Sequence, residues 1–212
     1  SKNEVIKEAQ TRFIKDQRDI LCKSTDLTEP EFEKSMNLAG RALTEYVLFR
    51  QKTIDRLKKI DKKDRESEIH NILVPMKRIL RSGDFSQDIY INNTWILDDK
   101  FMTYSTVLSD MEMTDLLREL TKGEVIKDDD RPDIAIIFSD DPKTTEKFDV
   151  VIVELKRKGL KPEDNVRVEV QLEKRARGLY GLYPGKVQSL WLYGVVELDN
   201  DYKSHLSSAG YH

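Results

Sequence analysis

The segment Arg131-Pro-Asp-Ile-Ala-Ile-Ile-Phe138, followed after a polar loop by Val150-Val-Ile-Val-Glu-Leu-Lys156, predicts two apolar strands with charged residues at their ends. Side chains alternate along a strand, so Glu154 and Lys156 share one face. Pairing of the two strands is expected to bring Asp133 beside Glu154. Carboxylate oxygens suit Mg²⁺ or Mn²⁺, and the Lys156 ammonium is close enough to orient a metal-bound water. This pattern predicts a site that cuts phosphodiesters.

Pro132-Asp133, followed by Glu154-Leu155-Lys156, resembles the motif of the PD-(D/E)xK nuclease superfamily. The resemblance covers about the last two thirds of the chain, and the required strand, loop, strand context adds to a short motif. It implies an α/β fold, a restriction-endonuclease-like mixed sheet flanked by helices. The alternative is a salt bridge between Glu154 and Lys156 at the rim of a sheet, with Asp133 in a turn.

The ligands of the predicted metal site are the carboxylates of Asp133 and Glu154 and the main-chain carbonyl of Leu155. The resemblance also implies a glutamate that reaches the metal from the helix before the sheet. Glu68 is the position that looks like it, at the edge of the apolar stripe of that helix. Glu66 is the competing position, and a merely solvated Glu68 is the other alternative.

Residues 165–182 carry mixed signals, because alternating valines favour a strand and the later residues favour a helix. A helix agrees with the superfamily order of helix, strands, helix, strand, and we predict a helix. On it, Gln171 lies where nuclease relatives often carry a glutamine near the active site, so the resemblance gives it a catalytic role beside Asp133, Glu154 and Lys156. Basic residues are expected to hold the nucleic-acid phosphates: Arg157, Lys158, Lys174 and Arg175.

The charge of the chain is unevenly distributed. Its 212 residues carry a formal net charge of −3, which argues against a generic nucleic-acid coating protein. Acidic residues outnumber basic ones between Glu124 and Asp149, whereas basic residues outnumber acidic ones between Lys156 and Arg177. An acidic centre that holds cations beside a basic stretch that holds phosphates is what a metal-dependent nuclease needs.

The single cysteine, Cys22, excludes a disulfide framework within one chain, so we expect a cytoplasmic protein. No segment approaches the roughly 20 consecutive apolar residues that a membrane helix needs. We therefore expect no membrane partner.

The first 60 residues read as helices. An amphipathic pattern covers residues 3–22, and a capping box at Thr28-Glu29-Pro30-Glu31 begins a second helix that extends to about Ile60. We predict a helical segment over residues 1–62 and a nuclease-like domain over residues 63–212. The two helices pack on each other, or they form a coiled-coil homodimer or a connector to another domain.

The remaining elements are short. We predict a helix with Ile69 and Ile79 on one face that Pro75 ends or kinks, and an exposed or capping role for His70. Strands are expected around residues 89–91, 94–97 and 101–107, and a helix over 114–123. A strand over 187–196 is expected to be buried on both faces, with no closing element after it.

A narrower resemblance rests on the segments Tyr46–Arg50, Asn93–Asp99 and Val107–Asp110. They resemble the C-terminal region of large bacterial proteins that join a GHKL-type ATPase to a restriction-endonuclease-like domain. This implies an ATPase region outside the present residues and a role in anti-phage defence. The predicted function is thus Mg²⁺-dependent endonuclease cleavage of DNA. The alternatives are an RNase with the same site and a non-catalytic module that couples an ATPase to a partner.

Overall fold

The computed structural model describes residues 27–82, 90–120, 127, 129–138, 147–182 and 185–209. The chain forms two compact units, residues 1–56 and residues 57–212. This division falls slightly earlier than the boundary expected after residue 62. The helix expected over residues 3–22, and with it Cys22, lies outside the described residues.

The long helix α2 spans Glu29–Lys58, and its predicted start is confirmed. The backbone N–H of Thr28 donates to the Glu31 carboxylate at 2.9 Å, and the Thr28 hydroxyl donates to the same oxygen at 2.6 Å. These bonds satisfy an amide that would otherwise lack a partner at the start of the helix. Across the described part of the chain, no helix is both long enough and apolar enough to cross a membrane.

The second unit is built on a five-stranded mixed sheet in the order β1-β2-β3-β4-β5. The first four strands pair antiparallel, and β4 pairs parallel with β5. The strands are β1 (Arg78–Arg81), β2 (Thr106–Ser109), β3 (Ile134–Phe138), β4 (Phe148–Leu155) and β5 (Val187–Val195). The helices are α3 (Glu66–Leu73), η1 (Thr94–Ile96), η2 (Asp99–Met102), α5 (Met113–Leu120), α6 (Pro162–Leu182) and α7 (Asn200–Ser208).

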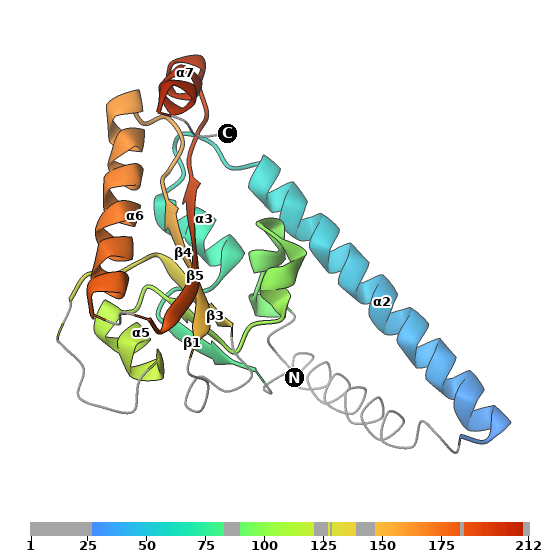
Figure 1. Ribbon diagram of the computed structural model, residues 1–212. Coiled ribbons are helices and arrows are strands. Elements are labelled where there is room, and N and C mark those ends of the chain that lie inside the picture. Colours follow the sequence, from blue (N-terminus) through green and yellow to red (C-terminus); the bar gives the residue numbers. More distant parts are fainter. Residues whose placement is uncertain are drawn as a thin grey trace. The chain divides into compact units, whose positions relative to one another are not determined.

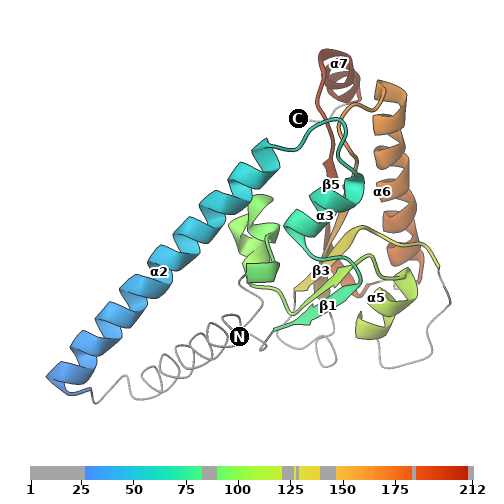
Figure 2. The ribbon, with the colours of Figure 1, turned by 180° about the vertical axis from the view of Figure 1, so that it is seen from behind.

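Helices cover both faces of the sheet, as expected for the α/β class. Val150 and Ile152 of β4 pack with α5 and α6, whereas Val151 and Val153 pack in a second core with the end of α3 and Phe101 of η2. Figures 1 and 2 show α6 and α3 on opposite sides of β4 and β5. The alternation predicted along β4 is therefore confirmed for its apolar residues, and it turns residue 154 toward α6.

The expected helix around Ile69–Ile79 is shorter than predicted. α3 ends at Leu73, just before Pro75, and the chain then turns at Lys77, whose φ of 57° is positive. Strand β1 follows at Arg78, so Ile79 lies in the sheet. Proline cannot continue a helix, and this is the physical reason for the break.

The strand expected over 94–97 is wrong, because residues 94–96 form the 3-10 helix η1. Asn92 Oδ1 accepts from the Thr94 backbone N–H at 3.1 Å, and the Asn93 amide donates to the Ile72 carbonyl at 2.8 Å. These local bonds compete with strand pairing. In the run expected as a strand over 101–107, η2 comes first and β2 begins only at Thr106.

Two expectations about the end of the chain are also wrong. Strand β5 is not buried on both faces, since Leu192 is 38% exposed. Helix α7 does follow β5, and it begins where the side chain of Asp199 accepts from the Tyr202 backbone N–H at 2.7 Å. Aspartate is a favoured N-cap residue, so this start was readable from the sequence.

Candidate functional site

Asp133 and Glu154 meet where β3 begins and β4 ends. The antiparallel register pairs Ile134 with Val153. Asp133, which precedes Ile134, therefore lies opposite Glu154, which follows Val153. Asp133 Oδ2 accepts a hydrogen bond from the Leu155 backbone N–H at 2.6 Å. The pairing therefore brings together the two carboxylates that the sequence analysis singled out.

Glu154 is a buried acid, with 2% of its surface exposed. Its pKa is raised to about 7, first by burial and then by the negative charge of Asp133, while the positive charges of Arg175 and Lys156 oppose the rise. A carboxyl group with this pKa exchanges its proton near neutral pH. The site thus carries more negative charge than its protein surroundings fully stabilise.

Arg175 of α6 forms an ion pair with Glu154 inside the protein. The guanidinium is also buried, and its Nη2 donates to the Arg131 carbonyl at 2.5 Å. The ion pair lacks hydrogen-bond geometry, and within the described residues neither Glu154 Oε1 nor Arg175 Nη1 has a hydrogen-bond partner. Arg175 was expected to hold a phosphate of the nucleic acid. Instead it points inward, because residue 154 faces α6.

Lys156 follows β4 directly and bridges to helix α3. Its Nζ donates to the Leu155 carbonyl at 3.0 Å and lies 4.0 Å from Glu66 Oε2. Only 17% of the lysine side chain is exposed. The carbonyl proposed as a metal ligand and the lysine proposed to orient water are therefore in direct contact.

Of the two glutamates at the start of α3, Glu66 is the one whose pKa responds to the charge of Asp133. Its pKa is raised by burial, and among the charges around it Lys156 lowers the pKa while Asp133 raises it. Glu68 instead folds back, and its Oε2 accepts from the Arg65 backbone N–H at 2.9 Å. Glu68, the position that the resemblance indicated, is thus bonded at the start of α3, whereas its competitor Glu66 lies beside Lys156.

His70, which was expected to be exposed or to cap a helix, is 2% exposed. Its Nε2 lies 2.9 Å from Ser109 Oγ. Burial lowers its pKa, against the opposing charges of Asp133 and Asp110. The backbone N–H of Asp110 donates to the Asp133 carbonyl at 2.8 Å, so this cluster also fixes the backbone of Asp133.

Two other residues of α6, Lys174 and Gln171, were also predicted to belong to the site. Lys174 forms an ion pair with Asp130 at 2.5 Å, which ties α6 to the segment before Asp133. Gln171 lies one turn before Arg175, and its Oε1 is buried without a hydrogen-bond partner in the described part of the chain. Within the described residues, no hydrogen bond joins Gln171 to Asp133.

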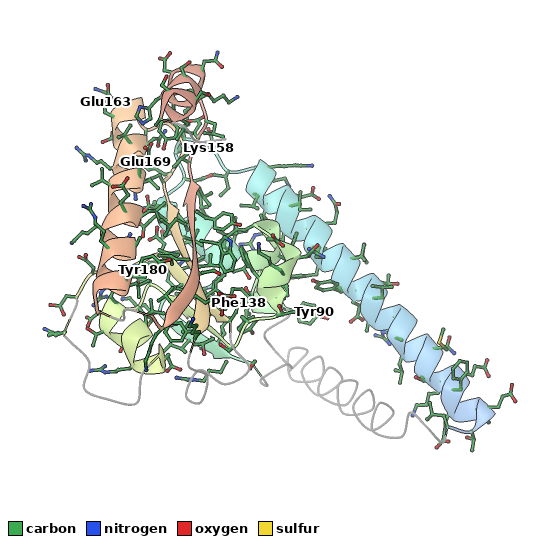
Figure 3. All side chains as sticks on the ribbon, in the orientation of Figure 1. Tyr90, Phe138, Lys158, Glu163, Glu169 and Tyr180 are labelled. Carbon is green, nitrogen blue, oxygen red and sulfur yellow. The ribbon has the colours of Figure 1, made fainter. Side chains whose placement is uncertain are left out.

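Arg157 and Lys158 hold the linker between α2 and α3. Arg157 Nη1 donates to the Lys62 carbonyl at 3.5 Å, and Lys158 Nζ donates to the Ile60 carbonyl at 3.0 Å. Lys158 lies at the end of the sheet where α6 begins (Figure 3). These two basic residues were expected to bind phosphate, and in the structure both donate to backbone carbonyls of this linker.

The oxygen atoms of the site are of the chemical type that binds a hard divalent cation. Asp133, Glu154 and the Leu155 carbonyl offer oxygens, although Glu154 Oε1 is already paired with Arg175 and the Leu155 carbonyl already accepts from Lys156 Nζ. In the described residues, however, no group of three or more His, Cys, Asp or Glu side chains has an arrangement that could hold a metal ion. A metal ion here would be held by two carboxylates and one carbonyl. It would compete with the guanidinium of Arg175 for the carboxylate of Glu154.

Comparisons of the chain with protein-family models, with curated proteins and with solved structures found no match.

Proposed function

We propose that this protein is a metal-dependent nuclease with a restriction-endonuclease-like fold that hydrolyses phosphodiester bonds in DNA. The observation that carries the proposal is the meeting of Asp133, Glu154 and Lys156 at neighbouring ends of β3 and β4. The order of elements supports it in part, because α3 precedes the sheet and α6 lies between β4 and β5, while α5 stands as an additional helix between β2 and β3.

In this proposal Asp133, Glu154 and the Leu155 carbonyl hold Mg²⁺ or Mn²⁺. A bound divalent ion supplies a more acidic water and neutralises charge on the phosphate. In the hydrolysis a water oxygen bonds to phosphorus and releases one proton to solvent, the bond from phosphorus to a sugar oxygen breaks, and that sugar oxygen takes up one proton from solvent, so that one water is consumed in all. Lys156 donates a hydrogen bond to the attacking water or to the phosphate, and Glu66 keeps the ammonium beside the carboxylates.

Arg175 sets a condition on this mechanism. Its guanidinium already neutralises part of the charge of Glu154. Ligation by Glu154 therefore requires the guanidinium to move or to share the carboxylate. Arg175 would then act as a positioning residue for Glu154 and for the Arg131 carbonyl rather than as a surface phosphate contact.

The same ion pair favours a second candidate function. A guanidinium that permanently replaces the cation would leave a nuclease-like fold without catalysis. The protein would then be a non-catalytic module that couples a partner or an ATPase region through its helices. Metal binding separates the two functions, because the non-catalytic module has no need of Mg²⁺ or Mn²⁺.

The test is a cleavage assay on plasmid, linear duplex and single-stranded DNA and on RNA, each with Mg²⁺, Mn²⁺ or EDTA. We expect cleavage of DNA that EDTA abolishes. Asp133→Asn and Lys156→Ala should each lower the rate at least about 100-fold, the scale of losing a group that acts in the transition state.

Matched controls come from α5, where Asp115 and Arg118 form an exposed ion pair at 3.0 Å. Asp115→Asn makes the same chemical change as Asp133→Asn, and Arg118→Ala removes a positive charge as Lys156→Ala does, so both should leave the rate unchanged. If the protein cleaves RNA and not DNA, the proposed substrate changes from DNA to RNA while the proposed chemistry stays the same. Cleavage that survives in both site variants, or no binding of Mn²⁺ by calorimetry, would overturn the nuclease proposal in favour of the non-catalytic module.

A further inference from the structure

Helix α2 presents large apolar side chains to solvent along one face. Phe32, Met36, Leu43 and Val47 are each between 55% and 63% exposed. Their spacings of four, seven and four residues place them on one side of an α-helix. We call these four residues the α2 stripe. A stripe of this kind favours burial against another helix.

The charges of α2 are divided between its two ends. Glu29, Glu31 and Glu33 lie in its first turns. The last turns carry four basic residues and one acidic residue, Asp55, while Lys34 is the one basic residue of the first turns; the basic residues at the end are Arg50, Lys52, Arg56 and Lys58. A second α2 lying antiparallel would set the acidic end of each helix beside the basic end of the other. A parallel arrangement would set like charges together, which is unfavourable.

The register of an antiparallel pair follows from the seam. A coiled-coil seam runs along the α2 stripe at alternating spacings of four and three residues, through Phe32, Met36, Ala39, Leu43, Tyr46 and Arg50. Laying this seam antiparallel on its copy sets Met36 level with Tyr46 and Leu43 level with Ala39, so the helices cross near Arg41. The residues around this crossing are small. Ala39 and Gly40 are exposed, and a Cβ atom added to Gly40 would meet nothing within 4 Å. Small residues let two helices approach closely.

The same register accounts for the charged residue on the seam. Arg50 becomes level with Phe32 of the second copy and lies within about one turn of its Glu29 and Glu33. Arg50 already lies over the Tyr46 ring, at 5.3 Å from its centroid, so its guanidinium is arranged for contacts with aromatic rings. A cation on this seam therefore selects the antiparallel orientation.

We propose that α2 is a dimerisation helix and that its α2 stripe packs antiparallel against the α2 stripe of a second copy of this chain. The proposal rests on exposure, spacing and charge in α2 and does not depend on nuclease activity. Its test is therefore a mass measurement on the full chain, and either proposal can fail alone.

In sedimentation equilibrium we expect a particle of about twice the 24.8 kDa of the chain. Leu43→Glu should raise the dissociation constant at least about 100-fold, because each dimer would bury two unpaired carboxylates. Leu48→Glu is the matched control. Leu48 is 56% exposed on the same helix but lies off the stripe, so its variant should remain dimeric. Circular dichroism checks that both variants keep their helix content.

Orientation is tested with single cysteines in a Cys22→Ser background. In the antiparallel pair, Met36→Cys should form a disulfide only when mixed with Tyr46→Cys, and neither variant should cross-link with itself. Self-linking of Met36→Cys would show a parallel pair and overturn the proposal. A wild-type monomer at all concentrations, or equal dissociation of the Leu43→Glu and Leu48→Glu variants, would also overturn it.

Discussion

The carboxylate of Glu154 and the guanidinium of Arg175 form an ion pair in the interior between β4 and α6. Both side chains are almost fully removed from solvent, at 3% and 8% exposed. Each group has lost its hydration, so each depends on the other. The pair therefore links the stability of the fold to the electrostatics of the candidate site.

Replacing Arg175 by methionine should destabilise the protein by about 3–5 kcal/mol at pH 8, because it leaves a buried carboxylate without its counter-charge. The loss should be smaller at pH 6, where Glu154 can take up a proton, since its pKa is already raised to about 7. Urea unfolding at the two pH values measures both effects.

The neighbouring Lys174 supplies the control for this variant. Its ion pair with Asp130 is largely exposed, with 67% of the lysine side chain accessible. Lys174→Met should cost less than about 1 kcal/mol, with little difference between pH 6 and pH 8. Equal losses in the two variants would show that the Glu154–Arg175 pair has no special role in stability.

The pH dependence of stability should carry the signature of Glu154. Its pKa rises from an ordinary value of 4.5 to about 7 on folding, so between these values the folded protein keeps a proton that the unfolded chain releases. The contribution of this group is thus fully present below about pH 4.5 and is lost as the pH rises through 7.

Glu154→Gln removes this titration. The stability of the wild type minus that of the variant should fall across this pH window, by roughly 3 kcal/mol at most, and level off above it. Denaturant unfolding from pH 4.5 to pH 8.5 checks the direction. A difference that rises with pH would mean that Arg175 outweighs burial and holds the carboxyl group ionised.

The sheet that carries the site was predictable because local pattern and tertiary structure agree there. β3 and β4 are apolar runs, and their alternation correctly assigned Val150 and Val151 to opposite faces. Helix α6 was harder, since its valines alternate as in a strand. Val168 is buried and Val170 is 60% exposed, as expected on a helix, whereas a strand would place both valines on one face.

The partners of the site residues were not predictable in the same way. Glu66 and Glu68 differ by two positions, and which one closes the start of α3 depends on a single bond to the Arg65 N–H. The inward direction of Arg175 depends on which face of β4 meets α6. His70 required knowing that Ser109 lies beside α3. Such contacts join residues far apart in the sequence, where periodicity carries no information.

The two glutamates of α3 give a paired prediction. Glu66→Ala should lower Mn²⁺-dependent cleavage at least about tenfold with little change in stability, because Glu66 lies beside Lys156 and responds to Asp133. Glu68→Ala should cost about 0.5–1 kcal/mol of stability through its lost cap and leave the rate unchanged. Kinetics and urea unfolding on both variants test this. The reverse pattern would return the role to Glu68.

The turn after Lys156 contains Gly159, whose φ of 77° lies in the left-handed region. An alanine there would be strained, and its Cβ would lie 3.1 Å from carbon atoms of the Lys62 side chain. The Gly159 N–H also donates to Glu197 at 2.7 Å, so the turn is held from two sides. Gly159→Ala should therefore destabilise the protein by about 1–2 kcal/mol, as expected for a left-handed residue with a Cβ.

Gly178 in α6 is the matched control for Gly159. It lies in a helix, and a Cβ atom added there would meet nothing within 4 Å. Gly178→Ala should raise the free energy of unfolding by about 0.5–1 kcal/mol, because alanine loses less conformational entropy in a helix. The two substitutions are chemically identical, so thermal or urea unfolding should give shifts of opposite sign. Stabilisation by Gly159→Ala would mean that the turn holding Lys62 adopts a different backbone conformation in solution.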